Sequence, residues 1–207
     1  MKQFILTSFL TLIFASSYTQ SDKSVGVFAG PIFSSFSFVN SSGEDQSENY
    51  ESSELKVLGV QFSIEKSKHT FRPGLQMRQG GAKATMGTTP MTWKLNYLDV
   101  EAAYLFRLLK NDFVSLKLGA GVYGGYLLGG EQTIGTKSYS LNEEEVFSST
   151  DFGATGIANT QFSITRSMNL FVEYQYGMGL SQIENDVTEQ ETKNKFQALK
   201  VGLSFNL

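Results

Sequence analysis

The sequence has no cysteine and only one histidine, one tryptophan and three prolines among its 207 residues. Without cysteine the chain has no disulfide framework, no thiolate metal ligand and no lipid-modified N-terminal cysteine. After the N-terminal region no run of 18 or more apolar residues occurs, so no membrane-spanning helix is expected. The net charge of −3 and the pI of about 5.3 argue against nucleic acid as a partner.

Residues 1–19 have the composition of a secretory signal peptide. Lys2 supplies the positive start, and the apolar stretch from Phe4 to Ala15 is too short to span a bilayer. Cleavage is expected after Ser17 or after Thr19. This divides the chain into a cleaved signal peptide over 1–19 and one domain over 20–207. An exported protein without a helical anchor has three possible locations: the periplasm, the outer membrane or the medium outside the cell.

The last segment of the chain, FQALKVGLSFNL over 196–207, alternates strictly between apolar and small or polar residues. Side chains of a strand point to opposite faces with a period of two, so one face of this strand is apolar. Similar alternation returns along the chain between turn-like segments. Repeated strands of this kind behind an export signal are typical of a transmembrane β-barrel.

Eight strands are expected, and the segments between them alternate between short turns and long polar loops. Short turns on one side and long loops on the other are typical of bacterial outer-membrane barrels, whose short turns face the periplasm. The predicted fold is all-β: an eight-stranded antiparallel up-and-down transmembrane β-barrel with short periplasmic turns and long extracellular loops. The predicted strands are 25–39, 55–66, 70–84, 92–108, 113–128, 150–165, 169–183 and 195–207.

One face of most predicted strands is apolar and carries no charge. On the second strand such a face lies between Lys56 and Lys66 and consists of Leu58, Val60, Phe62 and Ile64. Ten residues at about 3.3 Å, tilted by about 40°, give a height of roughly 25 Å, which matches the apolar band of these barrels. The facing of the first strand stays open. The residues predicted to face lipid include Leu98, Val100, Leu116, Leu118, Val172, Tyr174, Val201, Leu203 and Phe205.

The opposite faces collect the charged residues of the strands. A charge in a dry interior costs several kcal/mol unless it is paired, so nearly balanced charges predict interlocking ion pairs. Because an eight-stranded barrel is just wide enough for its side chains to fill, we expect a plugged cylinder. The inward glycines are expected to make room for long basic side chains (119, 121, 125, 177, 179 and 202). The predicted network comprises Arg72, Arg78, Asp99, Glu101, Lys117, Glu173 and Lys200.

Two internal stretches and both ends of the mature chain resemble a known family. The segments FRPGLQ over 71–76 with QGGAK over 79–83, and LNYLDV over 95–100, are similar to the PorT-like outer-membrane β-barrel domain of Bacteroidota. The opening VGVFAG over 25–30 and the closing KVGLSF over 200–205 are similar to that domain's first and last strands. The resemblance implies an integral outer-membrane protein of a diderm bacterium, folded by the barrel-assembly machinery. The family's founding member has a role in protein secretion. That role is not assigned to this chain, because no catalytic or partner-binding motif is shared.

No catalytic, cofactor or metal site is predicted. His69 lies in a predicted short turn, away from the extracellular rim where a barrel enzyme would need it. Asp99 and Glu101 form a carboxylate pair on one inward face, but Arg72 and Arg78 on the neighbouring strand favour a structural network. The loops are acidic without the spacing of a calcium-binding loop. Aromatic girdles are expected from Trp93, Tyr97, Tyr104, Phe106 and Phe162.

The favoured function is a non-enzymatic outer-membrane barrel with an envelope-structural or surface-interaction role through its acidic loops. Expected partners are outer-membrane lipids, lipopolysaccharide and an extracellular or secretion-system protein. Three alternatives stay open. They are a narrow channel or transport component, a lipid-modifying enzyme, and a soluble periplasmic lipocalin-like binder whose Asp99 and Lys200 would be exposed.

Overall fold

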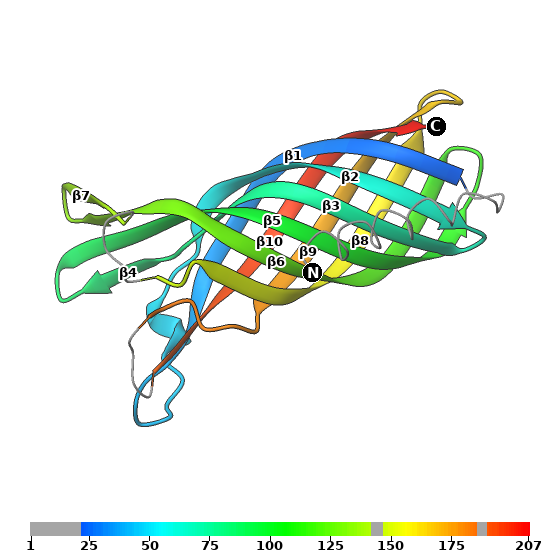
Figure 1. Ribbon diagram of the computed structural model, residues 1–207. Helices are drawn as coiled ribbons and strands as arrows, with labels where there is room; N and C mark the ends of the chain where they lie inside the picture. The colour runs from blue at the N-terminus through cyan, green and yellow to red at the C-terminus, as the bar shows by residue number, and fades with distance from the viewer. Residues whose placement is uncertain (1–21, 142–146, 186–189) are drawn as a thin grey trace, which may run out of the picture.

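The computed structural model describes residues 22–141, 147–185 and 190–207, which form an antiparallel all-β structure (Figure 1). The predicted signal peptide lies outside these residues. Among the described residues, no helix has the length and apolarity needed to cross a membrane. The elements are β1 (Asp22–Val39), the short 3₁₀ helix η2 (Ser47–Asn49), β2 (Ser53–Lys66), β3 (His69–Gly80), β4 (Lys83–Met86), β5 (Thr89–Lys110), β6 (Val114–Ile134), β7 (Lys137–Ser140), β8 (Thr150–Ser163), β9 (Met168–Gly179) and β10 (Glu191–Asn206).

Eight of the ten strands close on themselves. Their hydrogen-bonded order is β5-β3-β2-β1-β10-β9-β8-β6, and β6 pairs with β5 to complete the ring. The first and last strands pair along most of their length, from Ser24 with Asn206 to Val39 with Glu191. Closure removes the unpaired edges that an open sheet would expose. The prediction of an eight-stranded antiparallel barrel is therefore confirmed.

The two ends of the barrel differ, as the alternation of turns and loops predicts. At one end, here the turn end, the connections are short, and the β2–β3 turn is only Ser67 and Lys68, with Ser67 at a φ of 57°. Asp22 and Leu207 also lie at the turn end, where the backbone N–H of Leu207 donates to the carbonyl of Lys23. At the other end, here the loop end, the connections are longer and carry β4 and β7.

The strands β5 and β6 run for 22 and 21 residues and extend beyond the barrel at the loop end (Figure 1). There β4 pairs with β5 and β7 pairs with β6, which makes a four-stranded ribbon. The predicted third strand, 70–84, is interrupted at Gly81, whose φ is 144°. A Cβ at Gly81 would lie 2.0 Å from the carbonyl oxygen of Trp93, so only glycine fits there.

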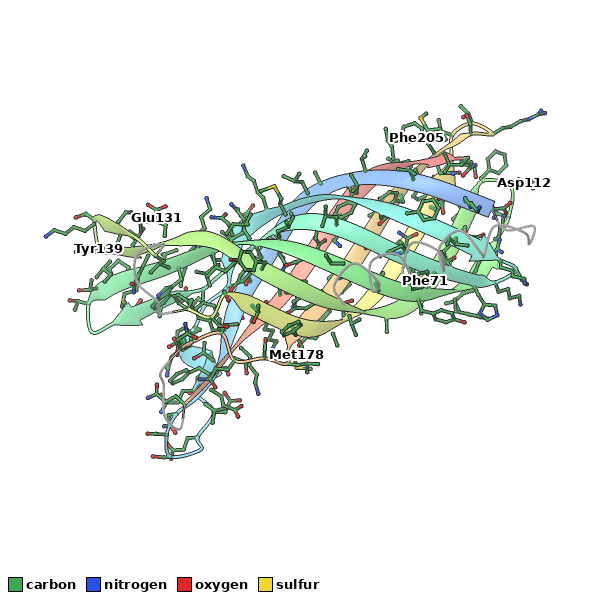
Figure 2. All side chains as sticks on the ribbon, viewed as in Figure 1. Phe71, Asp112, Glu131, Tyr139, Met178 and Phe205 are labelled. Carbon is green, nitrogen blue, oxygen red and sulfur yellow. The ribbon has the colours of Figure 1, made fainter. Side chains whose placement is uncertain are left out.

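The outward face of the barrel is apolar, as Figure 2 shows for Phe71, Met178 and Phe205. Val100 on β5 is 62% exposed, whereas its chain neighbour Asp99 is 0% exposed. All nine residues predicted to face lipid lie on this face. Leu98, Val100, Leu118, Tyr174, Val201 and Phe205 are exposed, and Leu116, Val172 and Leu203 are half-buried.

The first strand, for which the sequence does not determine the outward face, follows the same rule. On β1, Val25, Val27 and Phe33 point outward, while Phe28 and Ile32 are buried inside. The soluble-binder alternative requires Lys200 to be exposed, and it is 2% exposed. The orientation of the side chains is therefore the reverse of a lipocalin-like carrier.

The predicted aromatic girdles are correct in part. Tyr104, Phe106 and Phe162 are exposed on the outer face. Tyr97 is instead buried inside the barrel, and Trp93 packs against Phe36 and Tyr50 at the loop end. The prediction was wrong for Tyr97 and Trp93 because they lie an even number of positions before Asp99 on β5, and residues at such spacing share the inward face of a strand.

Candidate functional site

The interior of the barrel holds a chain of ionised side chains, and they form three layers along its axis. All seven residues of the predicted network lie in these layers. The structure adds three more, Glu65, Arg107 and Asp151, so that five acidic side chains meet five basic ones. The acidic residues are Glu65, Asp99, Glu101, Asp151 and Glu173, and the basic residues are Arg72, Arg78, Arg107, Lys117 and Lys200.

The central layer contains two cations and two carboxylates. Arg72 forms a two-pronged contact with Glu173 across the lumen, donating from both terminal nitrogens, one of them at 3.0 Å. Lys200 lies 3.6 Å from Glu101 and 3.7 Å from Glu173. The amide of Gln175 donates to Glu101 at 3.0 Å. Each buried charge therefore has an opposite charge beside it, which offsets much of its desolvation cost.

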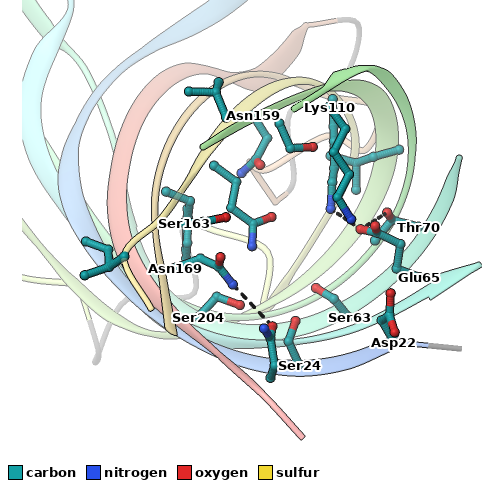
Figure 3. A pocket seen from close by; sticks show the side chains of 18 of the residues that line it. Asp22, Ser24, Ser63, Glu65, Thr70, Lys110, Asn159, Ser163, Asn169 and Ser204 are labelled. Atoms are coloured by element: carbon teal, nitrogen blue, oxygen red, sulfur yellow. Dashed lines mark hydrogen bonds and ion pairs between the residues drawn. The ribbon is translucent and has the colours of Figure 1, made fainter. Parts of the chain in front are cut away.

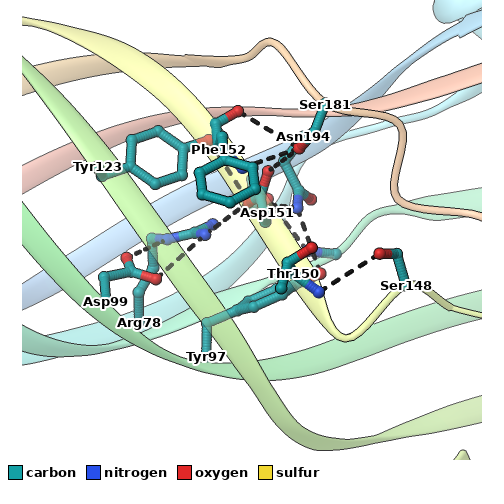
Figure 4. Close-up of polar contacts among 12 residues, drawn as sticks. Arg78, Tyr97, Asp99, Tyr123, Ser148, Thr150, Asp151, Phe152, Ser181 and Asn194 are labelled. Carbon is teal, nitrogen blue, oxygen red and sulfur yellow. Dashed lines mark hydrogen bonds and ion pairs between the residues drawn. The ribbon is translucent and has the colours of Figure 1, made fainter. Parts of the chain in front are cut away.

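The loop-end layer is built around Arg78 (Figure 4). Its Nε donates to Asp99 at 2.6 Å, and one terminal nitrogen donates to Asp151 at 2.7 Å. The side chains of all three residues are fully buried. Gln76 donates to Asp99 at 3.1 Å and Asn194 donates to Asp151 at 2.9 Å. Two carboxylates thus share one guanidinium, supported by neutral amide donors.

Three aromatic rings enclose the Arg78 guanidinium. Its Cζ lies 4.7 Å from the centre of Tyr97, 4.9 Å from Tyr123 and 5.0 Å from Phe196. Aromatic faces attract a guanidinium, and the attraction is larger when water is excluded. The lumen is therefore closed at this level by packed rings as well as by ion pairs. These inward aromatics are not among the residues predicted to fill the lumen.

The glycines of the lumen serve these rings more than the basic side chains. A Cβ at Gly177 would lie 2.2 Å from the Phe196 ring, and one at Gly202 would lie 2.4 Å from the Phe171 ring. Gly125 makes room for an ion pair, since its Cβ would lie 2.5 Å from Asp99 Oδ1 and 3.5 Å from a terminal nitrogen of Arg78. The expectation that the inward glycines accommodate long basic chains was therefore too narrow.

The turn-end layer has a different balance. Glu65 accepts from Lys117 and lies 3.2 Å from Arg107, and Thr70 also donates to it at 3.3 Å. Two cations therefore share one carboxylate. The parity of β2 and β5 turns Glu65 and Arg107 inward, so alternation alone indicates their place.

The loop end is closed by an apolar cluster, here the cap, contributed by β1, β5 and the loops. Its rings include Phe36, which lies 5.7 Å from Tyr50 and 6.0 Å from Trp93 between ring centres. Burial of Tyr50, with the negative charge of Glu184 nearby, raises the pKa of its hydroxyl. The buried members of the cap are Phe36, Ala82, Leu95, Tyr97, Leu141, Phe147 and Ile183.

The first loop is held in place by a short acidic turn. Asp45 accepts hydrogen bonds from the hydroxyl and the backbone N–H of Ser47. These hydrogen bonds keep the pKa of the exposed Asp45 carboxyl below its ordinary value. Of the acidic residues predicted for the loops, Glu44, Asp45, Glu48, Glu51, Glu54, Glu184 and Glu191 are described, while Glu143, Glu144, Glu145, Asp186 and Glu189 lie outside the described residues.

The turn end, in contrast, opens into a polar cavity of about 560 Å³, here the vestibule (Figure 3). It reaches inward to Arg72 and Phe171, both buried. Hydroxyl and amide side chains are the largest group in its wall. Among the labelled residues these include Ser24, Ser63, Thr70, Asn159, Ser163, Asn169 and Ser204.

The residues considered as catalytic candidates make contacts with aromatic rings or form ion pairs within the barrel. His69 is at the turn end, where its Nδ1 contacts the Tyr104 hydroxyl and its ring lies 5.4 Å from Phe106 between centres. Asp99 and Glu101 belong to the loop-end and central layers. Within the ranges that the structure describes, no three histidine, aspartate or glutamate side chains group as a metal site.

Comparison with known proteins identifies the fold. No protein-family model matches the chain, and no curated protein matches its sequence. Neisserial surface protein A is 14% identical, with a TM-score of 0.52 over 87% of this chain and 96% of that chain. The outer-membrane protease OmpT from Escherichia coli is 9% identical, with a TM-score of 0.51 over 93% and 100%. OprG from Pseudomonas aeruginosa is 11% identical, with a TM-score of 0.49 over 90% and 96%. This chain has the fold of small outer-membrane β-barrel proteins.

Proposed function

We propose that this chain is an integral outer-membrane protein of a diderm bacterium, with its turn end in the periplasm and its loop end outside the cell. The support is the apolar outer face and the asymmetry of the two ends. The proposal includes membership of the PorT-like family, which rests on the resemblance of the strand sequences. Its expected partners are the barrel-assembly machinery, which folds such proteins, and the lipids of the outer membrane, including lipopolysaccharide.

The lumen is proposed to be closed to ions. The observation that carries this proposal is the fully buried Arg78 between Asp99 and Asp151, enclosed by rings and covered by the cap. An ion on this path would have to displace packed side chains and break paired charges, which costs several kcal/mol. The chain is therefore proposed to act through its surfaces and not as a conduit.

Planar-bilayer recording tests the closed lumen. The purified, refolded chain is expected to give no stable single-channel steps. Stable steps that change in amplitude in the Lys117→Ala or Glu173→Ala variants would overturn the proposal and favour the alternative of a narrow channel or transport component.

The proposed role is non-enzymatic, either envelope-structural or surface interaction. Its support is that His69 is remote from the loop end, while the strand carboxylates are engaged in ion pairs. The extracellular loops instead present acidic side chains, and the ribbon extends beyond the barrel with mostly basic charges, Lys83, Lys94 and Lys137 against Glu131. An exposed surface of this kind suits an extracellular or secretion-system protein partner.

A deletion strain tests this role when it is complemented with the wild-type gene or with a variant whose first-loop glutamates are changed to glutamine. Wild-type complementation is expected to restore adhesion, secretion or envelope-stress resistance, and the variant to restore less. The lipid A species are compared in the same strains. A difference in acylation or phosphorylation would overturn the non-enzymatic assignment in favour of a lipid-modifying enzyme.

A further inference from the structure

The three layers of the lumen differ in charge and in access to water. The central layer has two cations and two carboxylates, and the loop-end layer has one cation and two carboxylates. The turn-end layer has two cations, Lys117 and Arg107, against the single carboxylate of Glu65. It therefore carries one uncompensated positive charge, and Lys117 and Glu65 both line the vestibule.

A second observation points into the same space. The Ser115 hydroxyl is buried on β6, two positions before Lys117 on the same inward face, and it has no hydrogen-bond partner among the described residues. Ser115 also lines the vestibule. A buried hydroxyl without a partner costs free energy, so a donor of this kind is normally satisfied by a ligand or by water.

The rim of the vestibule does not cancel the positive charge inside. Its charged lining residues are three basic and two acidic: Lys23, Lys110 and Arg166, and Asp22 and Asp112. Deeper in the wall, amides such as Asn159 and Gln161 supply further donors. Besides these three and Lys117, the wall has a fifth basic residue, Arg72, which is engaged by Glu173 and Glu101 in the central layer.

We propose that the vestibule is a binding site for an oxyanion, the phosphate or carboxylate group of a small soluble solute, held by Lys117 and Ser115. The anion completes an alternating array in which Lys117 lies between Glu65 and the ligand, while Arg107 contacts Glu65 from its other side. Charge-assisted hydrogen bonds of this kind are roughly twice as strong as neutral ones. The cavity lies within the roughly 300–1,000 Å³ of small-molecule sites, so a small solute fits inside it.

The test is a titration of the full mature chain, refolded in detergent, with inorganic phosphate in one arm and citrate in the other. Amide NMR shifts of Ser115, Lys117 and Glu65 report binding, and chloride at the same ionic strength is the reference anion. A saturable shift is expected with phosphate, citrate or both, and the arm that binds more tightly assigns the ligand as phosphate or carboxylate. Shifts no larger than those with chloride in both arms would overturn the proposal.

Variants separate a site from general charge attraction. Lys117→Met is expected to weaken binding at least tenfold, whereas Glu65→Gln is expected to tighten it because the competing carboxylate is gone. Lys193→Met, a cation at the opposite end of the barrel, is the matched control and is expected to change affinity less than twofold. Equal weakening by Lys117→Met and Lys193→Met would overturn the site.

Folding is checked for each variant by the shift of its band on unboiled SDS gels. Ser115→Ala changes no charge and removes no ion pair, so it decides the outcome even if a charge variant fails to fold. It is expected to weaken binding several-fold. An unchanged affinity in this variant would contradict the assignment of Ser115 to the site.

Discussion

Replacement of Arg78 by methionine is the perturbation that most directly probes the closed lumen. Arg78 is fully buried and donates to Asp99 at 2.6 Å and to Asp151 at 2.7 Å. Methionine fills part of the volume but leaves two carboxylates facing each other without a cation. Removal of one partner from a buried ion pair typically costs about 3–5 kcal/mol, so we expect a loss of at least this size.

The structure also predicts how the loss is recovered. In the triple variant Arg78→Met, Asp99→Asn, Asp151→Asn no charge remains in the loop-end layer, and the three rings still have an apolar neighbour. Replacement of a whole buried ionic group by neutral side chains is often close to neutral. The triple variant is therefore expected to regain most of the stability that the single variant loses. Arg78→Lys keeps the charge but not the planar fork, so an intermediate loss is expected.

Urea unfolding in lipid vesicles measures these differences, with the fluorescence of the single tryptophan, Trp93, and the gel shift as independent signals. The reasoning is refuted if Arg78→Met loses less than about 1 kcal/mol, or if the triple variant is as unstable as the single one. Either result would mean that the ion pairs of the loop-end layer contribute little to the folded state.

Three further predictions concern the outer face, the cap and the first loop. Val100→Arg places a charge on the outer face near the middle of β5 and is expected to cost about 2–4 kcal/mol in urea unfolding; a cost equal to that of the same change in an exposed loop would contradict the lipid placement. Phe36→Ala removes a ring 6.0 Å from Trp93, so Trp93 emission should shift to the red and acrylamide quenching should increase; unchanged emission would contradict the packing of the cap. Ser47→Ala should raise the pKa of Asp45 toward its ordinary value, which a carbon-13 NMR titration measures. The turn is stabilised by the ionised Asp45 carboxylate at pH values above the ordinary carboxyl pKa, and this stabilisation is lost as the pH falls through the lowered pKa of Asp45. A pKa of Asp45 that is the same in Ser47→Ala and in the wild type would refute the role of the Ser47 hydrogen bonds.

The architecture could be predicted because a period of two is imposed on every membrane strand. Once Leu203 is assigned to lipid, Lys200 must face the lumen, and the same parity places Glu173 and Asp99 inside. The same rule indicates Asp151 and Glu65, which are missing from the predicted network. Both lie near strand ends, where the alternation has neighbours on one side only.

Other features could not be read from the sequence. Arg72 and Glu173 meet across the lumen although 101 positions separate them, and the alternation within a strand does not determine contacts across a barrel. The strands β4 and β7 have four residues each and the composition of loops, and they form only because β5 and β6 extend beyond the barrel. Inward rings such as Phe196 could not be recognised, because an apolar residue fits either face of a barrel strand.

The measurement that tests the central claim most directly is a spin-label scan along β10. The wild-type chain has no cysteine, so single cysteines at positions from 198 to 205 other than 202 can each carry one label without a background signal. Labels at 199, 201, 203 and 205 are expected to be accessible to oxygen dissolved in lipid, whereas labels at 198, 200 and 204 are expected to be shielded from it, and position 202 is left as glycine because a Cβ there would lie 2.4 Å from the Phe171 ring. Accessibility without a period of two, or with lipid contact at 198, 200 and 204, would contradict the outward placement of the apolar face.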